Sequence, residues 1–465
     1  MGQGEEVGGE ARWYLDPEAY LVPAEDGNRL LYAPLLGVAL LVDPRAARWL
    51  EGAQSPLGAA AEPGDLDLAQ PLARLGLMGR APALPRVAAP RVAPPFEPVN
   101  LTLFLTSACN LRCAYCYSSG GDSPQTMPEQ LALDAVALVA GNASRTSRKV
   151  AALHFHGGGE PTLARELMRG VIEKARGIAR ERGVTLELAL GTNGVMPEDA
   201  ARWVAATFDN VTLSIDGPSE IHDAQRPRAD GGPSHEAALR TAQLFDALGF
   251  SYALRVTATD ATVERMDEVV EHLTGASAAR KIKVEPLFVQ GRALEGGLPH
   301  PDPERFVEAF ARARRRAARL GRELIYSACR PQAVTDRFCA ATLGSICVTP
   351  RGELTACYEV TSLEDARAPL FFFGRHRAHD GGFDLDYQVI ARLQALTVDG
   401  AAECAGCFAK WHCAGDCPAK VLAPASRASA RALHRTWRCR ITRGLLRDEL
   451  LERLRGEEDL LGGAA

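Results

Sequence analysis

The 465-residue sequence predicts an α/β fold: a partial (β/α)6 barrel with a small N-terminal β-rich module and a C-terminal cysteine-rich domain. Two observations lead to this prediction. Between residues 99 and 323, six strand-like runs alternate with helix-like segments. Such alternation is typical of a parallel sheet, because right-handed crossovers place each strand beside its predecessor. From about Leu324 the alternation stops, and a glycine-punctuated region with most of the cysteines begins.

The six strand-like runs begin at Val99, Val150, Thr185, Asn210, Ser251 and Lys281. After the first run, Thr126 and Glu129 have the spacing of a capping box that would start a helix. After the second run, an apolar stripe at helical spacing is formed by Leu167, Val171, Ala175 and Ile178. In parallel barrels the chemistry lies on loops at the carboxyl ends of the strands. We therefore expect functional residues directly after these runs.

A stretch rich in proline and alanine predicts the clearest domain boundary, because such composition is typical of an extended linker. Ahead of it, strand-like runs at 29–33 and 38–42 and a helical piece near 46–50 suggest a small β-rich module. The predicted divisions are an N-terminal module (1–78), a linker (79–98), the barrel (99–323), a cysteine-rich domain (324–440) and a C-terminal helix with its tail (441–465).

The composition bears on which partners and which cellular compartment we expect for this protein. The net charge is −5 and 46% of the residues are apolar, which argues against a nucleic-acid partner or a membrane partner. No apolar run is long enough to cross a bilayer, and the N-terminus lacks the apolar core of a secretory signal, so we expect a cytoplasmic protein. Thiols stay reduced there, so the 12 cysteines indicate metal binding or catalysis before disulfides.

Cys109, Cys113 and Cys116 follow the first strand in a C-x3-C-x2-C spacing. The short spacers allow one loop to supply three thiolates to an iron–sulfur cube and leave its fourth iron open to a ligand that is not protein. A zinc site completed by a distant ligand, or three unrelated buried thiols, are the alternatives. Zinc sites more often use C-x2-C pairs in a closed tetrahedron, which favours the iron–sulfur interpretation.

With Tyr115 ahead of the last cysteine, this motif resembles that of the radical S-adenosylmethionine (radical SAM) enzymes. The resemblance implies a [4Fe–4S] cluster on the three cysteines whose fourth iron binds S-adenosylmethionine. Further motifs at the following strand ends match those of the family. The residues that the resemblance implies for the cofactor are Tyr115, Gly158, Gly159, Glu160, Asn193, Ser214, Asp216, Arg226 and Val289. Asn193 in its Asn-Gly pair would also suit an ordinary turn, and Val289 an ordinary core position.

The later cysteines resemble a SPASM domain, an extension that binds two auxiliary [4Fe–4S] clusters in some members of this family. The resemblance assigns Cys339, Cys347, Cys357 and Cys417 to one cluster and Cys404, Cys407, Cys413 and Cys439 to the other. Cys329 is then left over. The position of Cys347 is often not cysteine in such proteins, and without this ligand the first auxiliary cluster would keep an open iron. Fully ligated clusters suit electron transfer.

The resemblance implies reductive cleavage of S-adenosylmethionine to a 5′-deoxyadenosyl radical, which abstracts hydrogen from a substrate. We expect the substrate to be a ribosomally made precursor peptide that is crosslinked, epimerised or oxidised, and the electron donor to be a flavodoxin or ferredoxin. Tyr358 and Glu359 follow Cys357, where sulfatase-maturating members carry an Asp base immediately after the cysteine. They are candidate catalytic residues, although a structural role beside a cluster is the alternative.

Two other functions remain open from the sequence. The chain could be a radical SAM dehydrogenase or epimerase of a small molecule, or a non-catalytic iron–sulfur electron carrier. Residues 1–78 weakly resemble the modules with which peptide maturases recognise a leader peptide, and such modules bind a peptide as an added strand. A purely structural cap is the alternative for this segment.

Overall fold

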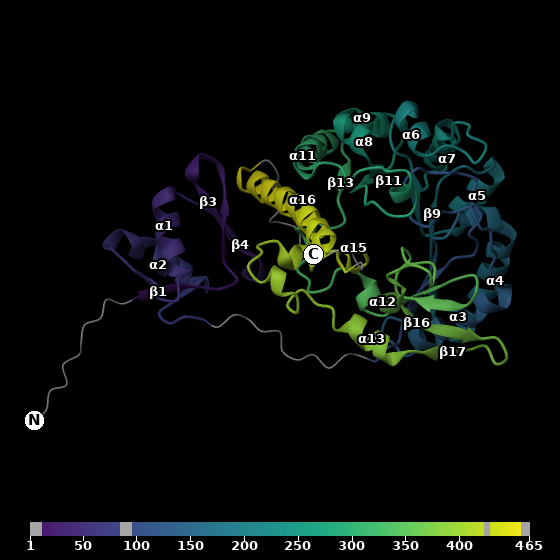
Figure 1. Cartoon of the computed structure of the whole chain (residues 1–465), viewed down its shortest axis with the longest axis horizontal. Helices are drawn as coiled ribbons and strands as arrows, with labels where there is room; N and C mark the ends of the chain where they lie inside the picture. Colours follow the sequence, from purple (N-terminus) through teal and green to yellow (C-terminus); the bar gives the residue numbers. More distant parts are fainter. Residues whose placement is uncertain (1–11, 84–94, 423–427, 457–465) are drawn as a thin grey trace, which may run out of the picture.

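The computed structural model describes residues 12–83, 95–422 and 428–456, arranged as a curved central sheet with an N-terminal module at one side (Figure 1). The middle of the predicted linker, residues 84–94, lies outside the described residues. None of the helices in the described ranges combines the length and the apolar character that crossing a lipid bilayer requires.

The central sheet has eleven strands among the described residues, in the order β13-β12-β11-β10-β9-β8-β7-β14-β15-β16-β17. Its six predicted parallel strands are β7 (Asn100–Leu103), β8 (Val150–Phe155), β9 (Thr185–Thr192), β10 (Asn210–Ser214), β11 (Ala253–Ala258) and β12 (Lys281–Pro286). They lie side by side in chain order, which confirms the partial (β/α)6 barrel.

The sheet continues beyond both ends of this parallel set. At one end, β13 (Glu323–Ile325) pairs in parallel with β12, so the boundary expected at 323/324 falls inside a barrel strand. At the other end, β14 (Ser345–Val348) pairs in parallel with β7, and three antiparallel strands follow: β15 (Glu353–Thr355), β16 (Phe372–Arg377) and β17 (Gly382–Leu385). The cysteine-rich domain therefore shares one sheet with the barrel.

The helices cover one face of this sheet and leave the other face, called the inner face below, more open (Figure 1). They are α3 (Glu129–Ser144), α4 (Arg165–Glu181), α5 (Glu198–Thr207), α6 (Ser219–Gln225), α7 (His235–Ala247), α8 (Asp260–Glu264), α9 (Met266–Ala276) and α11 (Pro303–Arg319). The short α10 (Arg292–Glu295) instead contacts the loop that carries Cys113 and Cys116. Strand side chains alternate between the two faces. In β8, Leu153 and Phe155 are fully buried in the main core, whereas His154 between them is partly exposed on the inner face.

The predicted capping box of the first barrel helix is wrong. Helix α3 begins at Glu129, its N-cap position is occupied by Pro128, and no side chain caps it. Proline cannot offer a capping oxygen, and its fixed φ sets the entry of the chain into the helix. Thr126 lies outside the helix, where its backbone pairs with Thr106 in an isolated antiparallel bridge.

The N-terminal module has a small core of its own. Its elements are β1 (Arg12–Leu15), β2 (Tyr20–Pro23), β3 (Arg29–Ala33), β4 (Val38–Val42), α1 (Pro44–Ala53), β5 (Ala59–Ala60), α2 (Pro63–Arg74) and β6 (Met78–Gly79). Strands β2, β3 and β4 form an antiparallel sheet with β4 at its edge. The two runs at 29–33 and 38–42 are β3 and β4, whereas sequence reasoning missed α2, which contains Pro71.

The cysteine-rich region contains short helices between its loops. These are α12 (Ala368–Phe371), α13 (Tyr387–Gln394), α14 (Lys410–Cys413) and α15 (Pro418–Val421), and the long α16 (Ala428–Leu454) ends the described chain. Leu446 and Leu450 of α16 are buried in the main core, and this helix packs along α11. Figure 1 shows α16 between the barrel and the N-terminal module, and it also touches β4.

The N-terminal module docks on α14 through a buried carboxylate. Glu18 is 5% exposed and accepts hydrogen bonds from Lys410 Nζ (2.5 Å), Trp411 Nε1 (2.8 Å) and the Tyr20 hydroxyl (2.8 Å). Beside it, the hydroxyl of Tyr32 contacts the His412 ring. A buried carboxylate is stable only when donors surround it. Because two of the donors to Glu18 come from α14, this contact favours one orientation of the module on that helix.

Replacement of Glu18 by alanine is expected to lower the free energy of unfolding by about 3 kcal/mol, because it leaves the buried Lys410 ammonium without its carboxylate. Denaturant unfolding followed by tryptophan fluorescence measures this. Glu236→Ala, which removes an exposed ion pair with Arg240 on α7, is the matched control and should change little. Equal effects of the two variants would contradict the docking role of Glu18.

Candidate active site

The three cysteines of the first motif lie on a loop directly after β7, at the carboxyl end of the parallel strands. Leu111 anchors this loop by packing, 1% exposed, with Val195 and with Cys109 and Cys113. Burial raises the pKa of the Cys109 thiol to about 11 and that of Cys113 to about 12. A buried neutral thiol must lose its proton to bind a metal, so loading this loop with iron releases protons.

The glycine-rich loop after β8 lies against the cysteine loop. Its backbone amides at Gly159 and Glu160 donate to the carbonyls of Thr106 (3.0 Å) and Ala108 (2.8 Å). Gly158 adopts a φ of 73°, a left-handed conformation that favours glycine. A Cβ atom on Gly159 would collide with the carbonyl of Ala108. Only glycine therefore allows the two loops to approach this closely.

Glu160 is 2% exposed and is held from three sides. Its carboxylate accepts hydrogen bonds from the hydroxyls of Thr162 (2.7 Å) and Thr192 (2.8 Å) and from the Asn193 amide (2.8 Å). Burial raises the pKa of Glu160, although these hydrogen bonds oppose the shift. The carboxylate is therefore oriented by its neighbours before any ligand binds, and it lies near Cys109, whose pKa its charge raises.

Asn193 joins the end of β9 to the cysteine loop. Its side-chain nitrogen donates to Asn110 Oδ1 (2.8 Å) and lies 4.0 Å from Cys109 Sγ. Its side-chain oxygen also accepts from the Val195 amide (2.9 Å), as expected for an Asn in a turn. Asn193 thus serves the turn and contacts the cysteine loop.

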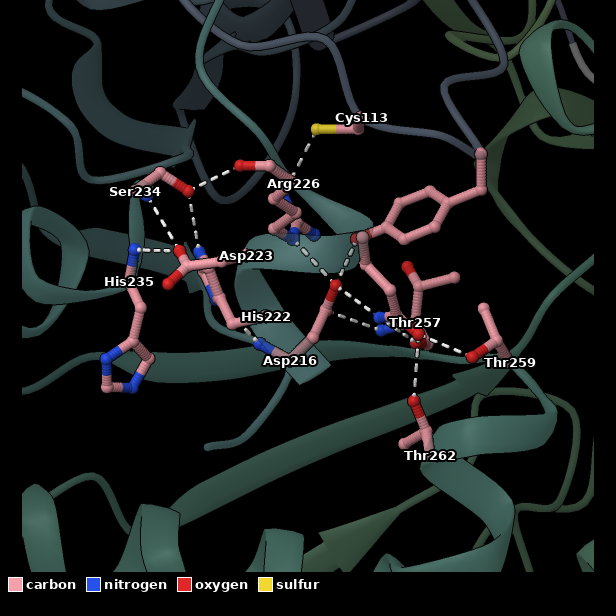
Figure 2. A network of polar contacts seen from close by, with 12 residues as sticks. Cys113, Asp216, His222, Asp223, Arg226, Ser234, His235, Thr257, Thr259 and Thr262 are labelled. Carbon is pink, nitrogen blue, oxygen red and sulfur yellow. Dashed lines mark hydrogen bonds and ion pairs between the residues drawn. The ribbon is translucent and has the colours of Figure 1, made fainter. Parts of the chain in front are cut away.

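A buried carboxylate at the end of β10 ties the cysteine loop to the barrel (Figure 2). Asp216 has no exposed surface and accepts hydrogen bonds from Arg226 Nε (2.9 Å), Gln225 Nε2 (2.8 Å), the Thr257 amide (3.0 Å) and the Tyr115 hydroxyl. Burial alone would raise the pKa of Asp216, but the Arg226 guanidinium and the other donors hold it below its usual value.

Arg226 extends from Asp216 to the cysteine loop. Its Nη1 atom lies 4.0 Å from Cys113 Sγ, and its guanidinium lies 5.3 Å from the centre of the Tyr115 ring. Behind this pair, His222 accepts a hydrogen bond from the Asp216 amide (3.2 Å), and Ser234 donates to the Arg226 carbonyl (Figure 2). The motif Ser214–Pro218 suggested the importance of Asp216, but Gln225, Thr257 and Ser234 carried no recognisable pattern.

The other residues expected to contact the cofactor lie at the same end of the barrel. Ser214 is the last residue of β10 and is partly exposed, and Val289 follows β12 with partial exposure. The structure therefore places these two residues at the carboxyl ends of the parallel strands, the end that also carries the cysteine loop. Arg226 and Asp216 bind each other, so Arg226 reaches the loop as half of an ion pair.

Four of the later cysteines line one cavity: Cys404, Cys407, Cys413 and Cys439. Burial raises the pKa of both Cys347 and Cys357, and neighbouring thiols add to the shift: Cys339 for Cys347, and Cys417 and Cys347 for Cys357. Cys329 is buried in the main core.

Both groups supply the thiol donors that an iron–sulfur cluster uses. Within the described ranges, no three or more His, Cys, Asp or Glu side chains converge closely enough to hold a single metal ion. A cube of four irons and four sulfides is larger than a single ion and takes each thiolate at a separate corner. The donor chemistry and the glycine-lined approach to the first loop therefore fit such a cluster.

Tyr358 and Glu359 lie in a turn after β15, not on a strand edge. Tyr358 is 40% exposed, and its ring packs edge-on against His156 at 4.9 Å between ring centres. Glu359 lies 3.4 Å from Lys420 Nζ and accepts from Gln290 (3.2 Å). Burial would raise the pKa of Glu359, but Lys420 and the other neighbouring donors lower it. Tyr358 thus lies beside the loop that follows β8, and Glu359 lies beside Gln290, which follows β12.

Comparison with known proteins agrees with this arrangement. Residues 103–273 match the model of the radical SAM superfamily. The chain is 26% identical to a serine-type anaerobic sulfatase-maturating enzyme of Klebsiella aerogenes over 74% of this chain and 85% of that protein. It is 32% identical to the mycofactocin maturase MftC of Mycolicibacterium smegmatis over 38% of this chain and 44% of the maturase.

A solved structure, anSMEcpe with bound AdoMet, has the same fold, with a TM-score of 0.59 and 17% identity over 78% of this chain and all of that one. These comparisons confirm the radical SAM prediction made from the first cysteine motif. They also confirm the cofactors expected from it, because the radical SAM family uses S-adenosylmethionine and a [4Fe–4S] cluster.

Replacing Gly159 with alanine is expected to weaken binding of S-adenosylmethionine by about tenfold or more, since forcing a methyl group into a filled space costs about 1–3 kcal/mol. Equilibrium dialysis against the anaerobically reconstituted protein measures the affinity, and iron per chain is recorded in parallel. Gly177→Ala in α4, where an added methyl group meets nothing within 4 Å, is the control. Unchanged affinity in Gly159→Ala would show that the two loops need not touch.

Proposed function

Because this chain is a radical SAM enzyme, we propose that it abstracts hydrogen from a ribosomally made peptide and so crosslinks, epimerises or oxidises it. The observation that carries this proposal is the position of the three-cysteine loop at the carboxyl end of a partial barrel, with two further groups of cysteines beside it. The names of its relatives point the same way, since these are a sulfatase-maturating enzyme and a mycofactocin maturase.

In this proposal Cys109, Cys113 and Cys116 hold the first cluster. When bound, that cluster and S-adenosylmethionine supply an electron and a 5′-deoxyadenosyl radical. The Gly158–Glu160 loop and Asn193 position the cofactor beside the thiols. Ser214 at the end of β10 and Val289 after β12 flank it. Asp216 acts indirectly, because it orients Arg226 and Tyr115 against the loop.

The remaining cysteines are proposed to hold two auxiliary clusters, one on Cys339, Cys347, Cys357 and Cys417 and one on Cys404, Cys407, Cys413 and Cys439. Cys347 is 2% exposed on β14, within a paired part of the sheet, which supports a fixed ligand better than an open iron. Fully ligated clusters suit electron transfer to or from a substrate radical. Tyr358 and Glu359 would then face the substrate between the first cluster and the first auxiliary cluster.

Two expectations about the cell complete the proposal. An electron must reach the first cluster from outside, and a flavodoxin or ferredoxin would supply it. Iron–sulfur clusters and free thiols are favoured by reducing surroundings, which supports a cytoplasmic location. A radical SAM dehydrogenase acting on a small molecule is the second candidate, but the N-terminal module favours a peptide.

The N-terminal module is proposed to bind the leader segment of the peptide along β4. Among the described residues this strand is hydrogen-bonded only to β3, and α16 contacts part of it, so an added strand would pair along the part of its other edge that α16 leaves uncovered. Leu40 and Leu41 on β4 are 37% and 47% exposed, an unusual amount of apolar surface on an edge strand. A peptide strand laid there would cover them.

Anaerobic reconstitution tests the cluster assignment. Wild-type protein should bind about 12 irons per chain, and Cys113→Ala and Cys404→Ala should each lose about 4. Cys113→Ala should form no 5′-deoxyadenosine with S-adenosylmethionine and dithionite, whereas Cys404→Ala should keep some cleavage but yield no modified peptide. Cys329→Ala is the control and should keep all its iron. A wild-type protein that forms no 5′-deoxyadenosine would instead be an electron carrier.

The leader site is tested with a synthetic peptide covering the N-terminal half of a short precursor encoded beside the gene. Leu41→Asp should weaken its binding about tenfold, because a charge on the strand edge opposes burial under the added strand. Fluorescence anisotropy measures the affinity. Leu57→Asp, at a 74% exposed position of the same module, should bind normally. Equal binding by both variants would leave the module a structural cap.

A further inference from the structure

Two cations lie next to each other on the inner face of the barrel. Arg255 on β11 and Lys283 on β12 are direct partners in the parallel register, and Ser214 on β10 pairs with Arg255 from the other side. The residues that flank Arg255 and Lys283 along their strands are fully buried against the helices, so these two side chains point to the opposite face. Both are partly exposed there.

Neither cation has a partner of its own. Across residues 12–83, 95–422 and 428–456, no side-chain hydrogen bond or ion pair within 4.0 Å is found for Arg255 or Lys283. Neighbouring cations differ: Arg226 pairs with Asp216, and Lys420 with Glu359. Two adjacent cations in a partly buried place repel each other, and an anion bound between them would offset this repulsion. The pKa of Lys283 is accordingly lowered, by burial and by the Arg255 charge.

The two carboxylates near this pair of cations, Glu285 and Glu359, already have other hydrogen-bond or ion-pair partners. Glu285, the next inward-facing residue of β12, accepts a hydrogen bond from the Ser327 amide (3.1 Å). Glu359 lies beside Lys420 and accepts from Gln290. Burial would lower the pKa of Arg255, but the charges of Glu285 and Glu359 raise it without a hydrogen bond or ion pair to the guanidinium. Among the described residues no carboxylate binds either cation directly, so a ligand carboxylate would be their first direct partner.

The position of the pair indicates where such a carboxylate would come from. Tyr117, which follows Cys116, and Tyr358, which follows Cys357, both lie near Arg255. Arg255 is thus close enough to the neighbours of Cys116 and Cys357 to interact with them electrostatically. The cation that reaches the Cys113 thiol is Arg226 instead. An anion bound at Arg255 would lie beside the thiol loops, where a substrate must be placed for hydrogen abstraction.

We propose that Arg255 and Lys283 bind a carboxylate of the peptide substrate, either an Asp or Glu side chain or the C-terminus, and so choose which residue meets the radical. This inference rests on the proposed function and deepens it by naming the substrate class. Arg255 supplies a planar pair of donors that matches a carboxylate, and Lys283 adds a second charge beside it.

The test uses the full chain, anaerobically reconstituted and loaded with S-adenosylmethionine. Three N-acetylated pentapeptides serve as probes: Gly-Gly-Glu-Gly-Gly amide, its Gln counterpart, and pentaglycine with a free C-terminus. Calorimetric titration should give about tenfold tighter binding of a carboxylate probe than of the Gln probe. Which of the two carboxylate probes is preferred identifies the source of the anion.

Variants make the assignment specific to this pair. Arg255→Gln and Lys283→Met should each reduce the preference for the carboxylate, and Arg255→Lys should restore part of it, because charge without the planar fork remains. Arg169→Gln, which removes an exposed guanidinium on α4 outside the barrel, should keep the full preference. These results together would support a carboxylate site for the substrate.

Two outcomes would overturn the inference. One is a wild-type protein that binds the Glu, Gln and free C-terminal probes alike or binds none of them. The other is a loss of affinity for S-adenosylmethionine in Arg255→Gln of tenfold or more while the preference for the carboxylate probe stays, which would assign Arg255 to the cofactor's carboxylate. Formation of 5′-deoxyadenosine is measured separately. Its absence in the wild type rejects the proposed function, whereas its presence without any carboxylate preference rejects this inference alone.

Discussion

Asp216 is a carboxylate without contact to solvent, and such a group is stable only when donors surround it. The donors here come from four separate places: the cysteine loop, helix α6, the residue that follows it, and strand β11. Satisfying one buried charge therefore positions Tyr115 and Arg226 and holds the cysteine loop against the barrel.

Side chains alternate along the barrel strands, so that one face of the sheet is apolar and the other is largely polar. Their outward side chains are apolar and fill the core under the helices, as Leu254 and Val256 do on either side of Arg255. Their inward side chains include histidine, serine, arginine and lysine, which stay partly exposed and keep some hydration. Gly191 on β9 contributes to the same face by leaving space for the His156 ring. The inner face is thus built for polar ligands without loss of packing elsewhere.

The sequence was sufficient to predict what depends on local pattern. The six strands follow from runs of apolar residues, and the C-x3-C-x2-C spacing identifies its loop because the ligands are adjacent in the chain. The capping box failed because the backbone of Thr126 pairs with Thr106, a contact far from the helix in sequence. The pairing of β14 with β7 and the partners of Asp216 are equally non-local. No single segment reveals that Arg255 lacks a partner, since this requires knowing every neighbour in space.

The contact between Glu18 and Lys410 has a consequence for the assembly of the enzyme. The N-terminal module contacts three residues that lie between Cys407 and Cys413: Lys410, Trp411 and His412. It therefore binds the segment that carries two thiols of one group. On the proposed ligand assignment, the N-terminal module would hold this segment in its folded conformation before the cluster is inserted. A chain without the contact between Glu18 and Lys410 would have to order this segment during iron insertion, at a cost in conformational entropy. Maturation of the second auxiliary centre would then be slower and more sensitive to iron shortage.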